Sequence, residues 1–130
     1  MSDLSNALSV SASGLRAQAQ RLQHVSENIA NADTPGYRRK MVRFETVAAA
    51  DPARGTVRTG AVQLDRSELP QVHDPAHPLS GPDGYYDGSN VDLIVEIADA
   101  REAQRSYEAN LKMFEQARQM SSGLMELLRK

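Results

Sequence analysis

The chain has 130 residues, a length that fits one ordinary domain. Charged residues make up 25% of it and the net charge is −2, so the overall charge does not favour binding to nucleic acid or to an anionic membrane. There is no cysteine, which excludes disulfides and thiolate metal sites. Aromatic residues are only 5%, fewer than a compact core normally uses, whereas Ala, Ser and Gln are abundant. This composition favours helices packed closely in a bundle or an array.

Apolar residues recur every seven positions near the N-terminus. A repeat of seven is typical of helices that pack lengthwise against other helices, so the sequence predicts an amphipathic helix from about residue 3 to residue 31. Gly14 and several serines weaken this helix, and we expect its first two turns to be disordered in the free chain. No basic segment followed by an apolar stretch opens the chain, so we expect no cleaved secretion signal. The apolar face consists of Leu4, Leu8, Ala12, Leu15, Ala19, Leu22, Val25 and Ile29.

The first helix is predicted to end in a tight turn. Pro35 moves Thr34 out of the helical region, and Gly36 tolerates a positive φ that other residues avoid. We therefore expect a turn over Thr34 to Tyr37 with proline and glycine at its centre. The basic residues 37–44 that follow are expected to be extended.

The seven-residue pattern is lost over residues 45–88. Apolar residues alternate only at Val42/Phe44 and at Val62/Leu64, which predicts one or two short strands. Proline and glycine interrupt the rest of this region. The chain is thus expected to comprise a helix and turn (1–36), a loop-rich small β region (37–88) and a C-terminal helix (89–130).

A second long helix is predicted from near Asn90 to Lys130. Ser89 and Asp92 have the spacing of a capping box, in which each satisfies the other's end of the first turn. Asn110 lies at the edge of the apolar face, where a polar side chain can fix the register of a helix pair. The predicted fold class is mainly α, with two long terminal helices and a small irregular β insertion between them. The apolar face consists of Leu93, Ile97, Ala100, Tyr107, Leu111, Phe114, Leu124, Met125 and Leu128.

Two segments of the middle region resemble metal sites only superficially. His73 and His77 are four residues apart, but the prolines around them prevent the helix that would bring them together, so we expect a solvated loop. Residues 83–88 resemble a calcium loop, but Tyr85 occupies a position that needs an oxygen ligand. We expect a turn packed by Tyr85 and Tyr86, and we predict neither a metal nor a cofactor.

One basic cluster follows the turn, and it is too small for a convincing nucleic-acid site. We expect it to contact acidic residues of a neighbouring chain, for example Glu27, Asp33 and Glu45 on another copy. The cluster consists of Arg38, Arg39, Lys40 and Arg43.

No frame for catalysis accompanies the three histidines. A nucleophile needs an adjacent base and a group that orients the base, and neither a nucleophile elbow nor a phosphate-binding loop is present. The sequence therefore predicts that the chain is not an enzyme.

Both ends of the chain resemble the bacterial flagellar rod and hook proteins. Residues 26–37, Ser-Glu-Asn-Ile-Ala-Asn-Ala-Asp-Thr-Pro-Gly-Tyr, resemble the N-terminal signature of this family, and residues 90–96 and 105–110 are similar to its C-terminal end. The chain resembles one member of the proximal rod more than that member's sibling. This closer resemblance lies in residues 75–79 and 84–86 and in the short length. Some relatives carry an insertion before the Tyr-Arg pair, whereas this chain, like the sibling, has the plain turn.

The resemblance implies an axial subunit of the flagellar basal body. Such subunits are exported unfolded through the flagellar type III apparatus and polymerise in the periplasm into a hollow rod that transmits torque. The terminal helices would pair as an antiparallel coiled coil facing the channel, with the β region outside. The implied partners are other copies, sibling rod proteins, the MS-ring or adaptor components and the export apparatus, with no nucleic acid and no membrane span.

The assembly interface implied by the resemblance and by the apolar faces spans both helices and the turn. Its predicted residues are Leu4, Leu8, Leu15, Leu22, Val25, Asn28, Ile29, Asn31, Thr34, Pro35, Gly36, Tyr37, Ile97, Tyr107, Asn110, Leu111, Phe114, Leu124 and Leu128.

Two other functions remain open at this point. A non-flagellar helical adaptor would be a well-folded monomer or dimer that never polymerises. An enzyme acting on the cell wall would need a carboxylate pair in a cleft, and Asp83, Asp87 and Asp92 lie too close to turns to build one.

Overall fold

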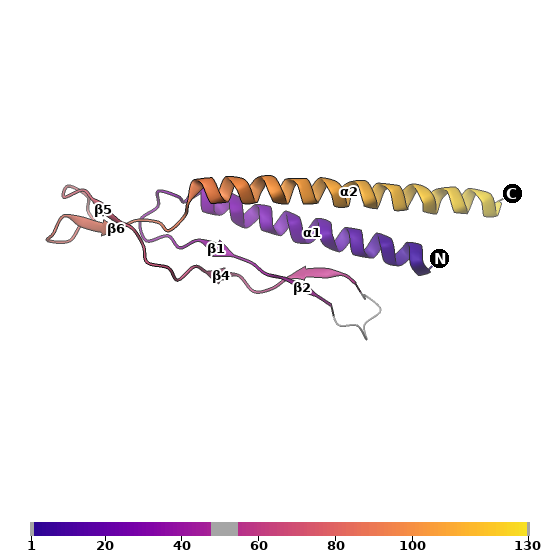
Figure 1. Ribbon diagram of the computed structural model, residues 1–130, viewed down its shortest axis with the longest axis horizontal. Coiled ribbons are helices and arrows are strands. Elements are labelled where there is room, and N and C mark those ends of the chain that lie inside the picture. Colours follow the sequence, from indigo (N-terminus) through magenta and orange to yellow (C-terminus); the bar gives the residue numbers. More distant parts are fainter. Residues whose placement is uncertain (1, 48–54, 130) are drawn as a thin grey trace.

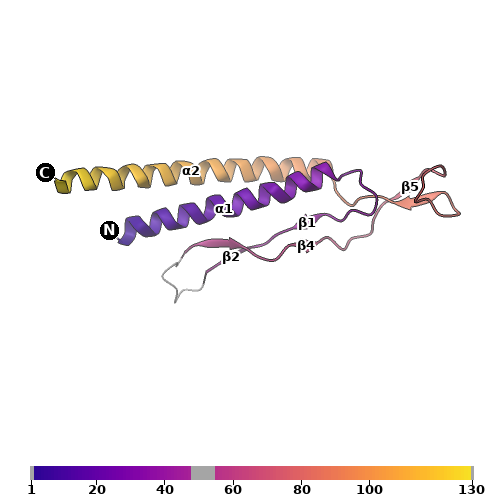
Figure 2. The ribbon, with the colours of Figure 1, turned by 180° about the vertical axis from the view of Figure 1, so that it is seen from behind.

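The structure, a computed structural model, describes residues 2–47 and 55–129. It confirms two long helices, α1 (Ser2–Ala30) and α2 (Leu93–Arg129). They lie side by side in opposite directions, so the start of α1 and the end of α2 share one end of the molecule (Figure 1). α2 is the longer, with 37 residues against 29, and it extends past the start of α1 (Figure 2). The last predicted helical residue, Lys130, lies outside the described residues.

The start of α2 differs from the predicted capping box. The Asp92 carboxylate accepts a hydrogen bond from the backbone N–H of Ile94 at 3.0 Å, and the helix begins at Leu93. The Ser89 hydroxyl instead accepts from the N–H of Val91 at 3.1 Å, one turn before the helix. The predicted reciprocal pair is therefore wrong. Asp92 alone caps the helix, where its negative charge is also favourable beside the unpaired N–H groups.

An antiparallel ribbon of short strands runs beside α1 (Figure 1). Strand β1 (Lys40–Met41) pairs with β4 (Gln63–Leu64), and β2 (Phe44–Thr46) pairs with β3 (Val57–Thr59). β3 packs on α1, where the buried hydroxyl of Ser13 accepts from the N–H of Val57 at 3.0 Å. α1 is thus held between α2 on one face and the ribbon on another.

A third strand pair projects beyond the helices. Strand β5 (Gln71–His73) pairs with β6 (Tyr85–Asp87) in an antiparallel lobe (Figures 1 and 2). The prediction of one or two strands was therefore too low. The residues of β5 and β6 are almost all exposed on both faces, so they lack the apolar alternation that marks a half-buried strand.

The fold has a sparse core. Among the described residues, the buried apolar side chains are Ala17, Val25, Ala103 and Ala117, and the largest fully buried side chains are polar, Glu96 and Asn28. Neither helix is apolar enough along its length to span a bilayer, as judged over the residues described.

Candidate functional site

Small and polar residues line the seam between the two helices. On α2, Glu96, Ala103 and Ala117 are buried at intervals of seven residues or multiples of seven. Asn28 of α1 meets Glu96, and Gly14 of α1 meets Asn110, the remaining position of the same row. Asn110, predicted at the edge of the apolar face, thus lies against α1, and its predicted contact with another chain stays a prediction.

Of the apolar face predicted for α1, Val25 is the one large side chain that is buried. Leu8, Leu15 and Leu22 are only half-buried, and Ile29 is exposed. Close approach of two helix backbones favours small side chains, and these lie at positions next to the leucine row rather than in it. The two rows of large apolar residues therefore flank the seam and remain partly open.

The side chain of Asn28 uses its full hydrogen-bonding capacity within one chain. Its amide donates to the carbonyl of Lys40 at 3.0 Å and to Glu96 at 3.3 Å. Its oxygen accepts from the Tyr37 hydroxyl and from the Lys40 N–H, both at 2.9 Å. Only 1% of the surface of Asn28 is exposed. Its buried side chain therefore links α1 to the turn and to the ribbon by hydrogen bonds. Its predicted contact with another chain stays untested, and its burial argues against that role.

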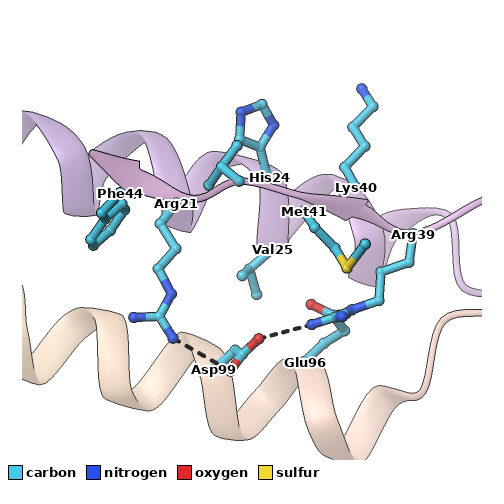
Figure 3. Close-up of a pocket in the computed structure, with 10 residues that line it drawn as sticks. Arg21, His24, Val25, Arg39, Lys40, Met41, Phe44, Glu96 and Asp99 are labelled. Carbon is cyan, nitrogen blue, oxygen red and sulfur yellow. Dashed lines mark hydrogen bonds and ion pairs between the residues drawn. The ribbon is translucent and has the colours of Figure 1, made fainter. Parts of the chain in front are cut away.

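The carboxylate of Glu96 is fully buried and paired. It accepts from the Arg39 guanidinium as well as from Asn28. The same guanidinium reaches Asp99 at 3.0 Å, and Arg21 of α1 approaches Asp99 at 3.4 Å. Figure 3 shows Arg21 and Arg39 directed at Asp99 from opposite sides of a cavity of about 390 Å³. We call Asn28, Tyr37, Arg39, Glu96 and Asp99 the polar cluster.

Burial and charge pairing in the polar cluster move two pKa values upward. Burial raises the pKa of Tyr37. For Arg39, burial works against the charge, but its hydrogen bond to Glu96 and the nearby carboxylates outweigh that effect and raise its pKa. Both residues keep the protonated form that donates a hydrogen bond in the cluster.

A second ion pair ties the ribbon to α1. Lys40 Nζ lies 2.6 Å from Glu27, on the side of the strand that faces away from α2 (Figure 3). The hydrogen bond with Lys40 lowers the pKa of Glu27, and that with Glu27 raises the pKa of Lys40. This pair is half-exposed, so its contribution to stability is small.

The predicted turn is confirmed, and it is anchored at both ends. The N–H of Tyr37 donates to the carbonyl of Thr34 at 3.2 Å, and Gly36 has a φ of 73°. The Thr34 hydroxyl donates to Asn31, whose amide donates back to the carbonyl of Glu27. Gly36 N–H also reaches the carbonyls of Asp87 and Gly88 at 3.1 and 3.2 Å, so the turn is attached to the end of β6.

The predicted role of the basic cluster needs correction. Arg39 and Lys40 pair with acidic residues of their own chain, and Arg38 donates to the carbonyls of Asp65 and Ser67. The ribbon runs along the helix pair, so Lys40 reaches Glu27 of α1 and Arg39 reaches Glu96 and Asp99 of α2 within the same chain. Arg43 is exposed.

The histidines and aspartates of the lobe have local roles. The ring of His73, which lies in β5 rather than in a loop, contacts Tyr85 at 4.7 Å between centroids, and His77 stacks on Tyr86 at 4.1 Å. The tyrosines thus pack as expected, but in strand β6 instead of a turn. Within the described ranges no group of three acidic or histidine side chains is placed to hold a metal.

The three aspartates considered for a hydrolase hold local structure. Asp83 accepts from the N–H of Tyr85, Asp87 accepts from the Gln71 amide at 2.5 Å, and Asp92 caps α2. They serve turns, a strand pair and a cap, and they do not form a catalytic pair.

The other predicted interface residues are either exposed or half-buried. Ile97, Leu124 and Leu128 of α2 are exposed, the last with 76% of its surface free. Thr34 and Gly36 are also exposed. Half-buried positions are Leu4, Asn31, Pro35, Tyr37, Tyr107, Asn110, Leu111 and Phe114.

Sequence reasoning missed Glu96 and the alanines of the seam. Glu96 is the one charged residue in the run Leu93-Ile94-Val95-Glu96-Ile97, and Ala103, Asn110 and Ala117 follow it at steps of seven. This second repeat, of small and polar residues, was the available indication of the true seam.

Two sequence families match the two ends of the chain. The family described as "Flagella basal body rod protein" matches residues 2–38, which contain α1 and the turn. The family described as "Flagellar basal body rod FlgEFG protein C-terminal" matches residues 83–127, which contain β6 and most of α2. The matched segments carry the seam and the polar cluster apart from Arg39, which lies one residue beyond the first match.

Similar proteins align over nearly the whole chain. The flagellar basal-body rod protein FlgC of Agrobacterium fabrum is 39% identical over 99% of this chain and 98% of its own length. FlgC of Salmonella typhimurium is 33% identical over 90% of this chain and 92% of its own length, and FlgC of Bacillus subtilis is 31% identical over 94% and 96%. Of the two proximal-rod members that the sequence resembles, FlgC and FlgB, these relatives support the first. The chain therefore belongs to the FlgC family of flagellar basal-body rod proteins.

Proposed function

We propose that this chain is a structural subunit, and not an enzyme, of the proximal part of the flagellar rod. The observation that carries the proposal is the mismatch between the seam and the surface. Small and polar residues fill the seam, while Ile94, Leu127 and Leu128 of α2 stay exposed. Apolar surface of this extent marks a binding surface, and the family membership indicates that other rod chains cover it.

The two helices serve as the axial part of the subunit. We propose that they form an antiparallel coiled coil facing the channel of the rod, with the ribbon and the lobe on the outside. The steps of seven from Glu96 to Ala117 support this pairing. Torque would then pass through long helical contacts rather than through one small patch.

Export and location follow from the same assignment. We propose that the chain leaves the cytoplasm through the flagellar type III apparatus without a cleaved signal and joins the rod in the periplasm. Its partners there would be other copies, sibling rod proteins and the MS-ring or adaptor components. Long helices with few large buried side chains would thread a narrow conduit at little cost of unfolding.

Removing the uncovered end of α2 tests the proposal. A chain that lacks residues 122–130 should still be exported, but it should be absent from isolated basal bodies, and the cells should not swim. The variant Glu115→Gln, which changes an exposed polar residue of the same helix, serves as the control and should assemble. Normal incorporation of the shortened chain, together with motility, would count against a structural role for this surface.

A further inference from the structure

The two helices pair in one register. Asn28 of α1 donates to Glu96 of α2, and fourteen residues earlier on α1, Gly14 lies against Asn110, fourteen residues later on α2. Continued to the start of α1, this register leaves the last seven residues of α2, 123–129, without an opposite residue. Figure 2 shows this end of α2 extending past the start of α1.

The unpaired residues 123–129, which we call the apolar tail, carry four large apolar side chains, and all four are exposed. Burial of such surface against another helix is favourable, so the apolar tail favours any register that would bring α1 alongside it. The four side chains are Leu124, Met125, Leu127 and Leu128.

A slide of α1 by seven residues along α2 would bring α1 alongside the apolar tail. The seam permits this slide, because its small residues recur at steps of seven and a shift by seven keeps the same faces in contact. Gly14 would then lie opposite Ala117 instead of Asn110, and Ala7 would lie opposite Leu124. The shape of the seam therefore fits both registers.

Hydrogen bonds and ion pairs join the first half of the chain, α1 and the ribbon, to α2 at one end only. There Arg39 pairs with Glu96, and its backbone N–H donates to Asn90 at 2.7 Å. Arg21 approaches Glu102 at 3.4 Å. Beyond Glu102, no hydrogen bond or ion pair connects α2 to α1 or to the ribbon within residues 2–47 and 55–129. The rest of the seam is held by packing alone.

A slide would separate the partners in the polar cluster. Seven residues of helix rise about 10 Å, so Asn28 and Arg39 would leave Glu96, and Asn28 would lie opposite Ala103. Buried polar groups that lose their partners are costly. We propose that the polar cluster holds the helix pair seven residues short of the register that would cover the apolar tail, and thereby keeps this tail open. The effect acts within a single chain and is independent of the proposed function.

The covalent link between the two halves does not itself set the register. Residues 65–70 connect the end of β4 to the start of β5, and the seven Cα steps across them reach up to about 24 Å when fully extended. Part of this length is folded into a turn, in which the N–H of Ser67 donates to the Asp65 carboxylate at 2.8 Å. The link therefore has slack that a slide can use.

Disulfides between the helices test the register, because the native chain has no cysteine. In the purified full-length chain, Gly14→Cys/Asn110→Cys reports the observed register, and Gly14→Cys/Asn110→Ala/Ala117→Cys reports the slid one. The Asn110→Ala change in the second variant removes the overlap with the new side chain at position 14. With the polar cluster intact, the first variant should form an intramolecular disulfide and the second should not.

Removing the polar cluster should release the slide. Asn28→Ala/Glu96→Ala should raise the disulfide between positions 14 and 117 about tenfold and lower that between positions 14 and 110 by a similar factor. The same two changes at exposed positions, Asn6→Ala/Glu108→Ala, are the matched control and should alter neither.

Two further variants separate the register from the driving force and from folding. Adding Leu124→Ser/Leu127→Ser to the released chain should abolish the disulfide between positions 14 and 117, because the tail then gains little from being covered. Glu96→Ala/Ala103→Glu moves the carboxylate seven residues along the same row, so Asn28 should follow it and the same disulfide should form. This variant decides the question if circular dichroism shows that the released chain has lost its helices.

Three outcomes would overturn the inference. The first is a disulfide between positions 14 and 117 while the polar cluster is intact. The second is a released or carboxylate-shifted chain that stays helical and links only positions 14 and 110. The third is a slide that persists with serines in the tail. Each is measured on the purified chain, so none of them bears on the rod assignment, which the incorporation of the shortened chain into basal bodies tests separately.

Discussion

Gly14 of α1 lies directly against the side chain of Asn110 of α2, with no space between them for a methyl group. A Cβ added at Gly14 would lie 2.8 Å from Asn110 Oδ1. The glycine that weakens an isolated helix is therefore what allows α2 to approach at the middle of the pair.

Replacing Gly14 with alanine should destabilise the chain despite the better helix propensity. The gain in propensity is about 1 kcal/mol, and the overlap with Asn110 is expected to cost about 2 kcal/mol. Denaturant unfolding followed by circular dichroism measures the difference. Gly123→Ala, where nothing lies within 4 Å, should show only the gain. Gly14→Ala/Asn110→Ala should recover most of the loss, and failure to recover would mean that the clash is not its cause.

Asn28→Ala should be among the most damaging changes in α1. It leaves Glu96, the Tyr37 hydroxyl and the Lys40 backbone without their shared partner, at a cost of about 3 kcal/mol in the free energy of unfolding. Asn6→Ala is the same change at an exposed position of the same helix and should be neutral or slightly stabilising. Equal effects of the two substitutions would show that the buried Asn28 amide contributes nothing to the free energy of unfolding.

Glu96→Gln should separate the charge of the buried pair from its shape. The substitution keeps the volume and one acceptor oxygen but leaves Asp99 as the acidic ion-pair partner of the Arg39 guanidinium, and we expect a loss of about 3 kcal/mol in the free energy of unfolding. The exposed Glu108→Gln in the same helix is the matched control and should change the free energy of unfolding by less than about 0.5 kcal/mol. The same denaturant titration compares both variants with the native chain.

The ion pair between Glu27 and Lys40 should make stability depend on acid pH. The folded state holds the pKa of Glu27 below its ordinary value of 4.5, so the carboxylate stabilises the fold above that pH. This contribution is lost as the pH falls below 4.5 and through the pKa of the folded state. The difference in stability between the native chain and Glu27→Gln should therefore be constant near neutrality and shrink in acid. A difference that does not change with pH would rule out a role for the charge.

Hydrogen exchange on the free chain should show a gradient along α1. Residues 22–29 lie beside the polar cluster and should be protected, whereas the first two turns should exchange quickly until a partner chain binds. This retains the expectation from sequence that the first turns are disordered in solution. Uniform strong protection from Leu4 to Ile29 in dilute solution would show that the helix needs no assembly to form.

The helices and the turn were predictable because local rules set them. Pro35 and Gly36 end α1 by their backbone preferences, and the apolar repeats mark both helices as amphipathic. The register between the helices was not predictable from the same rows, because large apolar residues were taken to fill the seam. Gly14 and Ala103 lie there instead, since close packing of two backbones needs small side chains.

The polar cluster was only half visible in the sequence. Asn28, Tyr37 and Glu96 belong to segments that resemble the family. Their contacts with one another, and those of Arg39 with Glu96 and Asp99, join segments that meet only in the folded chain. The pairing of β5 with β6 was missed for a related reason. A strand that is exposed on both faces, such as the one that contains Tyr85, lacks the alternation of apolar and polar residues by which a strand is predicted from sequence.

The antiparallel course of the helices brings the beginning of α1 and the end of α2 to one end of the molecule, although more than a hundred residues separate them in sequence. A donor dye on one terminus and an acceptor on the other would therefore be close in the paired state and far apart in a threaded chain. Energy transfer between the two dyes would therefore report, in real time, when the two helices of a newly exported subunit pair.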